Sequence, residues 1–295
     1  MKKFLSEKPL WASALVFIAL FAIVLLMSIV IHSEWANHIK AAVVLLAIWF
    51  LYRLEGKNLS ELGLTSRLFY LLPIGLLIGI LYFCMLFGFQ MLQNDISIQW
   101  NTNINWGLLF NGLWFLLGSV MIEEFIFRGY CFKKTYEQIG IVKTNALFAF
   151  LFIVFHWFVL DAWGNWGMML GLITTGFEHL LFATAFIQSR TLFLPIGIHL
   201  GNNWAQRHFF SVKNMGIADT TTLNDSLFSI TVADQQFSTG HIIGSYFITF
   251  ACFLLSTYLI WKWYNRNTPS VFSTFQGKYW RFEHFQVVKV FKPSK

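Results

Sequence analysis

Long apolar runs alternate with short polar connections along most of the chain. A run of about 20 apolar residues is long enough to cross the hydrocarbon core of a bilayer as a helix. The pattern predicts eight such segments, at about 9–31, 37–53, 69–93, 105–132, 144–161, 166–188, 191–210 and 241–263. The second and the seventh are the shortest or most polar of the eight. We therefore expect an all-α polytopic membrane protein of about eight transmembrane helices.

The composition points to the same class. Of 295 residues, 57% are hydrophobic and only 12% are charged, whereas soluble domains carry about 25% charged residues. Cys84, Cys131 and Cys252 stand singly in apolar surroundings. Because no CxxC spacing is present, the cysteines indicate neither a disulfide framework nor a zinc-cysteine site.

Basic residues gather in every second connection between the apolar segments. They are Lys2, Lys3 and Lys8, then Arg53, Lys57 and Arg67, then Lys133, Lys134 and Lys143, and finally Arg190. The opposite connections 94–104 and 162–165 contain no Lys or Arg, although Lys213 falls in the last one. By the positive-inside rule this bias predicts that both termini are cytoplasmic. Since membrane topology explains the pI near 9.3, we expect no nucleic-acid partner.

The chain ends in a basic and aromatic segment, residues 266–295. Its only acidic residue is Glu283. Such a cytoplasmic tail is attracted to anionic headgroups, and a purely solvated tail that helps to set topology is an equal alternative. We see no internal repeat or linker, so residues 1–265 are taken as one transmembrane domain.

Three charged residues stand close together near the end of the fourth apolar segment: Glu123, Glu124 and Arg128. Ionisable side chains at membrane depth are costly and usually have a functional task. Positions four apart share a helix face, and Glu before Arg is the favourable order, so Glu124 is expected to form a structural ion pair with Arg128. Glu123 is rotated by about 100° and has no evident local partner, as a general base requires.

Two histidines supply further candidates on separate segments. His156 shares a helix face with Phe152, and His199 shares one with Asn203. At about 1.5 Å per residue, the depths from the cytoplasmic ends of the segments are roughly 16, 20, 12 and 18 Å for Glu123, His156, His199 and Asn203. We therefore expect a carboxylate, two imidazoles and an amide to meet in one layer of the membrane.

These residues form three motifs in a fixed order: Glu123-Glu124-xxx-Arg128, Phe152-xxx-His156 and His199-xxx-Asn203. Together they resemble the signature of the CPBP family, which comprises the CAAX prenyl endopeptidases and bacterial bacteriocin-processing and self-immunity proteins. The resemblance covers about residues 105–205. It implies eight helices that enclose an intramembrane active site open to the cytosol.

The resemblance also implies roles for the residues of the motifs. Glu123 and His156 would activate a water molecule, and His199 and Asn203 would stabilise the oxyanion. Glu124 belongs to the same catalytic group through its motif. Peptide hydrolysis needs a base that takes a proton from water and hydrogen-bond donors that stabilise the oxyanion, so the residue types fit the reaction.

Zinc is the main alternative for the chemistry of this site. Members of the family are widely labelled metalloproteases, and Glu123, His156 and His199 would be the ligands if a metal were present. No HExxH pair occurs in the sequence. We therefore favour a site without a metal or other cofactor.

Other polar residues receive structural interpretations. Glu178 and His179 lie inside the sixth segment and outside the motifs, so we interpret them as a buried pair or as pocket lining. Gly167-xxx-Gly171 indicates helix packing. Residues 211–240 are interpreted as an extracytoplasmic loop with possible short strands.

The leading hypothesis is an intramembrane endopeptidase that cuts a membrane-associated peptide or protein near the cytosolic side. A non-catalytic bacteriocin-immunity scaffold and a proton-coupled transporter are the alternatives. Compact length and the lack of organelle signals favour a bacterial cytoplasmic membrane. The sequence does not name the substrate.

Overall fold

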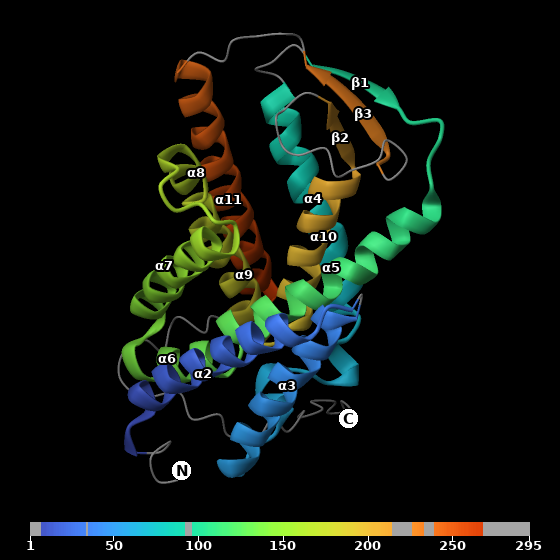
Figure 1. Ribbon diagram of the computed structural model, residues 1–295. Coiled ribbons are helices and arrows are strands. Elements are labelled where there is room, and N and C mark those ends of the chain that lie inside the picture. The colour runs from blue at the N-terminus through green and yellow to red at the C-terminus, as the bar shows by residue number, and fades with distance from the viewer. Residues whose placement is uncertain (1–6, 34, 92–95, 214–225, 233–238, 268–295) are drawn as a thin grey trace, which may run out of the picture.

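A computed structural model describes residues 7–33, 35–91, 96–213, 226–232 and 239–267 (Figure 1). Its elements in chain order are α2 (Pro9–Val30), α3 (Ala36–Leu54), the 3-10 helices η1 (Leu59–Leu62) and η2 (Ser66–Leu68), α4 (Leu71–Met91), β1 (Ile96–Trp100), α5 (Trp106–Phe127), α6 (Tyr130–Ile139), α7 (Ile141–Val159), α8 (Trp166–Gly171), α9 (Thr174–Ser189), α10 (Phe193–His208), β2 (Phe210–Lys213), β3 (Phe228–Val232) and α11 (Thr239–Asn267). Of the predicted tail 266–295, only residues 266 and 267 lie within this part.

Within the described residues, seven helices are long and apolar enough to cross a membrane. They are Pro9–Val30, Ala36–Leu54, Leu71–Phe89, Trp106–Ile139, Ile141–Val159, Trp166–Ser189 and Gly244–Trp263. The prediction of an all-α polytopic membrane protein is thereby confirmed. The remaining predicted segment, 191–210, is the 16-residue helix α10, of which eleven residues are buried. Because protein surrounds it, α10 can carry polar side chains that a lipid-facing helix could not.

The fourth predicted segment is broken into two helices. Helix α5 ends at Phe127, and α6 begins at Tyr130. At the break, an added Cβ on Gly129 would lie 2.1 Å from the Phe125 carbonyl oxygen, so only glycine fits this turn of the backbone. The break lets α6 leave the axis of α5 directly after the charged motif (Figure 1).

A three-stranded sheet covers one end of the helices (Figure 1). Strand β3 is central, antiparallel to β1 and parallel to β2. Strands β2 and β3 fall in the loop where short strands were expected, whereas β1 was not predicted. Backbone hydrogen bonds from Leu227 to His208, 2.9 Å, and from Phe228 to Phe209, 2.9 Å, attach the sheet to the end of α10.

Helices α4 and α10 make the most extensive helix contact in the described structure. Four glycines form it: Gly75 and Gly79 on α4, Gly197 and Gly201 on α10. An added Cβ on Gly79 would lie 2.1 Å from the Ile198 carbonyl oxygen, and one on Gly201 would lie 2.1 Å from the Leu76 carbonyl oxygen. Small residues four apart allow this backbone-to-backbone approach between membrane helices.

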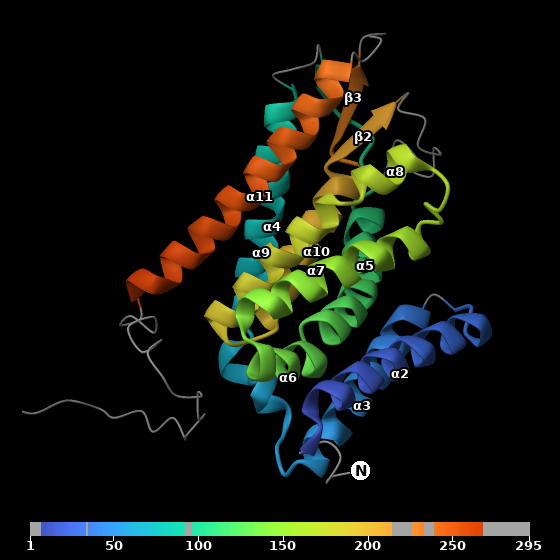
Figure 2. The same ribbon diagram turned by 90° about the vertical axis from the view of Figure 1, so that its left-hand side faces the viewer.

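The other helices surround this pair. Helix α9 contacts α7, α10 and α11, while α5 contacts both α3 and α10. Figure 2 shows α2 and α3 as a separate pair beside α5. Helix α5 therefore lies between the α2–α3 pair and α10, and it carries the charged motif in the middle of the protein.

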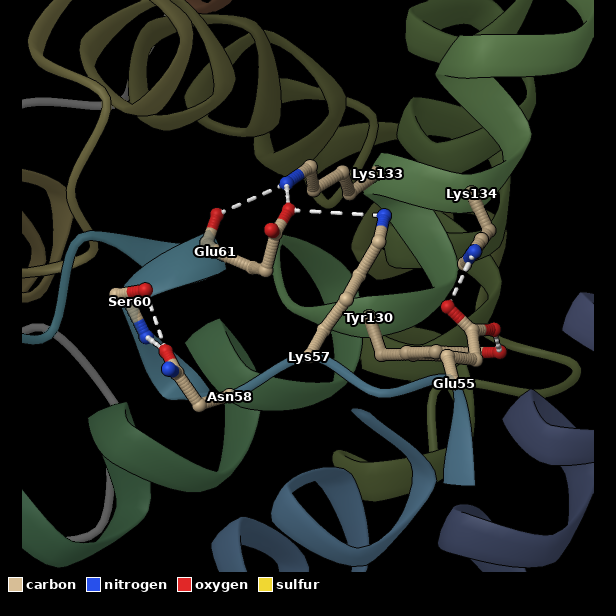
Figure 3. A network of polar contacts seen from close by, with 8 residues as sticks. All are labelled: Glu55, Lys57, Asn58, Ser60, Glu61, Tyr130, Lys133 and Lys134. Carbon is tan, nitrogen blue, oxygen red and sulfur yellow. Dashed lines mark hydrogen bonds and ion pairs between the residues drawn. The ribbon is translucent and has the colours of Figure 1, made fainter. Parts of the chain in front are cut away.

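A network of charged side chains joins the α3–α4 connection to α6 (Figure 3). Lys133 pairs with the Glu61 carboxylate and donates to the Glu61 backbone oxygen at 3.1 Å. Lys134 pairs with Glu55 at 2.6 Å, and the Tyr130 hydroxyl donates to the same carboxylate at 2.6 Å. Burial alone would raise the pKa of the Glu61 carboxyl, but the hydrogen bond and charge of Lys133 outweigh it and lower that pKa overall.

The same connection also holds the start of α10. The Leu192 backbone N–H donates to the Leu62 carbonyl at 3.0 Å, and the Thr191 hydroxyl donates to the Gly63 carbonyl at 2.8 Å. Gly63 has φ +64, a conformation that favours glycine. Helix α10 is thus fixed at its start by this turn and at its end by the sheet.

Adding a methyl group at Gly79 should destabilise the protein, because the new Cβ would overlap the Ile198 carbonyl. Overpacking costs about 1–3 kcal/mol, and we expect Gly79→Ala to lower the free energy of unfolding by that amount. Thermal unfolding of the detergent-solubilised protein measures it. Gly88→Ala on the same helix is the control, since a Cβ there meets nothing within 4 Å. Equal stability of Gly79→Ala and the native protein would contradict the close contact.

Candidate active site

A buried ion pair lies at the centre of the site. Glu124 and Arg128, one turn apart at the end of α5, are both fully buried, and Arg128 Nη1 lies 3.1 Å from Glu124 Oε1. The structure therefore contains the pair that the i,i+4 spacing suggested. Removing either partner from such a pair leaves an uncompensated charge in the interior.

Aromatic rings cover the Arg128 guanidinium. Its Cζ atom lies 4.4 Å from the centroid of Phe152 on α7 and 5.1 Å from that of Phe182 on α9. The negative face of an aromatic ring attracts a cation, most strongly where water is excluded. These contacts tie α5 to α7 and α9, and they give Phe152 a role beyond sharing a face with His156.

His199 on α10 contacts both glutamates. Its Nδ1 lies 2.8 Å from Glu124 Oε1, and its Nε2 lies 3.8 Å from Glu123 Oε2. Because an ionised carboxylate only accepts hydrogen bonds, Nδ1 is the donor in the shorter contact. The ring is stacked on Phe182 with centroids 4.5 Å apart and planes at 17°. Glu124 therefore orients His199 in addition to pairing with Arg128, which sequence spacing alone did not indicate.

Glu123 has no ion pair with Arg128 among the described contacts, and it lies further from His199 than Glu124 does. Its Oε2 atom is buried and has no hydrogen-bond partner among the described residues. The 3.8 Å separation from His199 Nε2 is beyond hydrogen-bond length. A buried carboxylate oxygen that no protein group satisfies is a place where water or a substrate group binds.

His156 near the end of α7 is oriented by its own helix. Its Nδ1 lies 2.8 Å from the Phe152 carbonyl oxygen. Since a carbonyl oxygen only accepts, Nδ1 must carry the proton, and Nε2 of the neutral ring has the free lone pair. His156 thus presents an acceptor nitrogen one turn beyond the ring that covers Arg128.

Asn203 lies one turn after His199 and is partly exposed. No hydrogen bond of Asn203 is found within the described part of the chain. The neighbouring Asn202 is 4% exposed, and its backbone nitrogen approaches Gly79 of α4. The side chain of Asn203, about 100° further around the helix, is therefore on a different face from the α4 contact.

The structure thus brings Glu123, Glu124 and Arg128 of the first motif into contact with His199 of the third. Residues 105–205, which carry all three motifs, match a family model described as type II CAAX prenyl endopeptidase Rce1-like. Over this segment the chain is similar to the CAAX prenyl endopeptidases. The resemblance found from the motifs is confirmed over these residues. The chain has no significant match among curated proteins or among solved structures.

The cluster also contains Glu178 of α9, which the sequence motifs did not include. Glu178 interacts electrostatically with Glu123, His156 and His199. The sequence left two interpretations open for Glu178 and His179, a buried pair or pocket lining. The two side chains have different neighbours, because the fully buried His179 lies among the rings of Phe132, Phe148 and Phe152. The second interpretation therefore fits Glu178 better. The available signal was an acidic residue inside an apolar segment.

The described residues contain no group of three or more His, Cys, Asp or Glu side chains arranged to hold a metal ion. The zinc alternative therefore lacks a preformed three-ligand site, as its ligands Glu123, His156 and His199 are placed here. Zinc sites in proteins have at least three such ligands. Metal-independent catalysis by this site stays a prediction.

Replacing Arg128 should strongly destabilise the protein. Arg128→Met leaves Glu124 buried without its guanidinium partner, which costs about 3–5 kcal/mol. The double variant Glu124→Gln/Arg128→Met removes both charges and should recover most of this stability. Thermal midpoints of the detergent-solubilised variants measure both effects. A double variant as unstable as Arg128→Met would mean that the ring contacts of Arg128, not its ion pair, stabilise the fold.

Proposed function

We propose that this chain is an intramembrane endopeptidase that hydrolyses a peptide bond of a membrane-associated peptide or protein. The observation that carries the proposal is the position of His199, 2.8 Å from Glu124 and 3.8 Å from Glu123, inside the segment that matches CAAX endopeptidases. An imidazole between two carboxylates, enclosed by apolar helices, is a costly arrangement that serves acid–base chemistry.

In the proposed mechanism Glu123 and His156 activate the attacking water. Glu123 Oε2 has no hydrogen-bond partner among the described residues, so it is free to accept a proton from water. His156 Nε2 carries a lone pair because Nδ1 donates to the Phe152 carbonyl. Two acceptors can hold and orient one water molecule while one of them takes its proton, and such general-base catalysis contributes about 10²–10⁴-fold.

His199 and Asn203 are proposed to stabilise the oxyanion. With Nδ1 donating to Glu124, the ring presents a second donor at Nε2 only as an imidazolium. Carboxylates next to both ring nitrogens favour that cation. The Asn203 amide, one turn further along α10, supplies the second donor. Preorganised donors at the developing negative charge are worth about 10²–10³-fold each.

The bilayer is part of the proposed site. We infer that the substrate reaches the cluster from the cytoplasmic side, and that the charged network around Glu61 and Lys133 lies on that side. Helix α11 begins at the same end of the protein as the sheet and runs away from that end, and α2 begins at the opposite end (Figure 1). This arrangement supports two cytoplasmic termini, in a membrane that we propose to be the bacterial cytoplasmic membrane.

Glu123→Gln should abolish proteolysis and leave the protein folded, because it removes the base and preserves the shape of the side chain. New peptide termini in membranes that contain the native chain or the variant, identified by mass spectrometry, measure the effect. A purified assay with a farnesylated CAAX peptide and its unprenylated counterpart then tests for a prenyl substrate. Glu137→Gln on α6, a carboxyl outside the cluster, is the control and should cleave normally.

Native activity of Glu123→Gln would show that Glu123 is not the base. If neither the native chain nor the variant produced new termini, the endopeptidase proposal would fail. Proton-driven uptake of a solute into vesicles that contain the native chain would then favour the transporter. Absence of such uptake would favour the immunity scaffold.

Chelation should leave activity intact if only protein groups carry the reaction. We expect prolonged dialysis against EDTA or phenanthroline to change the cleavage rate by less than about twofold, since Glu123 and His156 activate water without a metal in the proposed mechanism. Elemental analysis of the purified protein should find no stoichiometric zinc. Activity lost on chelation and restored by zinc would overturn the metal-independent mechanism.

A further inference from the structure

Glu178 brings a third carboxyl to the cluster from a helix outside the three motifs. It lies on α9, four residues before Phe182, so the two side chains share a helix face. Phe182 is stacked on His199 and covers Arg128. The face of α9 that carries Glu178 is therefore the face turned toward the site.

The neighbours of Glu178 come from four other helices. Those that interact with it electrostatically are Tyr82 of α4, Glu123 and Arg128 of α5, His156 of α7 and His199 of α10. Cys252 of α11 adjoins Tyr82. Within the described part of the chain Glu178 has no ion pair or hydrogen bond, and its side chain is only partly buried. The carboxyl thus lies within electrostatic range of the groups proposed to hold water and substrate and is bound to none of them.

We propose that Glu178 is a further catalytic residue, the general acid that protonates the leaving nitrogen of the scissile peptide bond. This inference rests on the proposed endopeptidase function. An amine anion is a very poor leaving group, so the reaction needs a proton donor as well as a base. Glu123 and His156 are already engaged with the attacking water in the proposed mechanism, whereas Glu178 has no other task.

The local charge explains why Glu178 can hold a proton at rest. Arg128 and His199 provide the positive charge of the cluster and already face Glu123 and Glu124. Carboxyl groups that share an enclosed site cannot all ionise, because like charges repel strongly where water is scarce. Glu178, without a paired cation among the described residues, is the carboxyl to which the proposal assigns the proton.

The proton balance of the proposed cycle closes with these groups alone. Water adds to the carbonyl carbon and gives one proton to Glu123. This addition turns the carbonyl group into a tetrahedral oxyanion. An electron pair of the oxyanion re-forms the C=O bond as the C–N bond breaks, and the leaving nitrogen takes the proton of Glu178. The products are a carboxylic acid and an amine. Transfer of the proton from Glu123 to Glu178 restores the starting state, with no other reactant.

The test compares two leaving groups in Glu178→Gln. The substrates are a farnesylated CAAX peptide and the same peptide with an ester in place of the scissile amide. An alkoxide leaves far more readily than an amine anion and depends less on an acid. We expect Glu178→Gln to lower kcat by about 10²-fold or more for the amide and by less than about tenfold for the ester. Glu123→Gln should lose both activities, and Glu137→Gln should keep both.

An infrared measurement provides a readout that needs no substrate. The native protein at neutral pH should show the C=O band of a protonated carboxyl group, and Glu178→Gln should lack it while keeping its thermal midpoint. Equal loss of amide and ester hydrolysis, no loss of either, or a carboxyl band unchanged in Glu178→Gln would each overturn the assignment of the acid. If the native chain hydrolysed neither substrate and membranes that contain it showed no new peptide termini, the endopeptidase function itself would fail and the role of Glu178 with it.

Discussion

The backbone contact between α4 and α10 is the constraint on which the rest of the structure depends. Gly79 and Gly201 leave no Cβ between the two helices, and a methyl group at either position would overlap a carbonyl oxygen of the partner helix. Without a solvent-driven hydrophobic effect between helices in lipid, close packing of this kind is what associates them. It encloses α10, and only an enclosed helix can bring His199 and Asn203 into the membrane interior.

The buried carboxylate of Glu124 then determines which residues are free for chemistry. It is shared by Arg128 at 3.1 Å and His199 at 2.8 Å, while Phe152 and Phe182 close over the guanidinium. Removing Glu124 or Arg128 alone leaves a charge without compensation in a region of low dielectric. Glu124 therefore links fold stability to the orientation of the imidazole. Its neighbour Glu123 faces the same imidazole at a longer distance and remains available to water.

Sequence patterns predicted what depends on spacing within one helix. Hydropathy located the spans, and the i,i+4 rule placed Glu124 beside Arg128. The Glu124–His199 hydrogen bond joins residues 75 positions apart, and the rings over Arg128 come from two further helices, so no local pattern contains them. Glycine spacing also proved ambiguous. Gly167-xxx-Gly171 was singled out for packing, yet of its two residues only Gly171 approaches another helix, at Tyr246 of α11.

The positions of Glu178 and α10 show why the remaining features need the three-dimensional arrangement. Hydropathy treats every long apolar segment as a membrane span, but burial of eleven residues in α10 results from the packing of α4, α5 and α9 around it. In the same way, an acidic residue in α9 has no evident meaning until Phe182, one turn later, is seen against His199.

Helix α10 is held at its start, its middle and its end, so the donors that it carries are fixed in position. The turn at Gly63 fixes its start, the glycine contact fixes its middle, and the sheet fixes its end. Oxyanion stabilisation requires donors that are already in place when charge develops, because a donor that must reorganise costs part of the energy it supplies. The helix that carries both proposed donors is therefore held along its whole length, as preorganisation of the site requires.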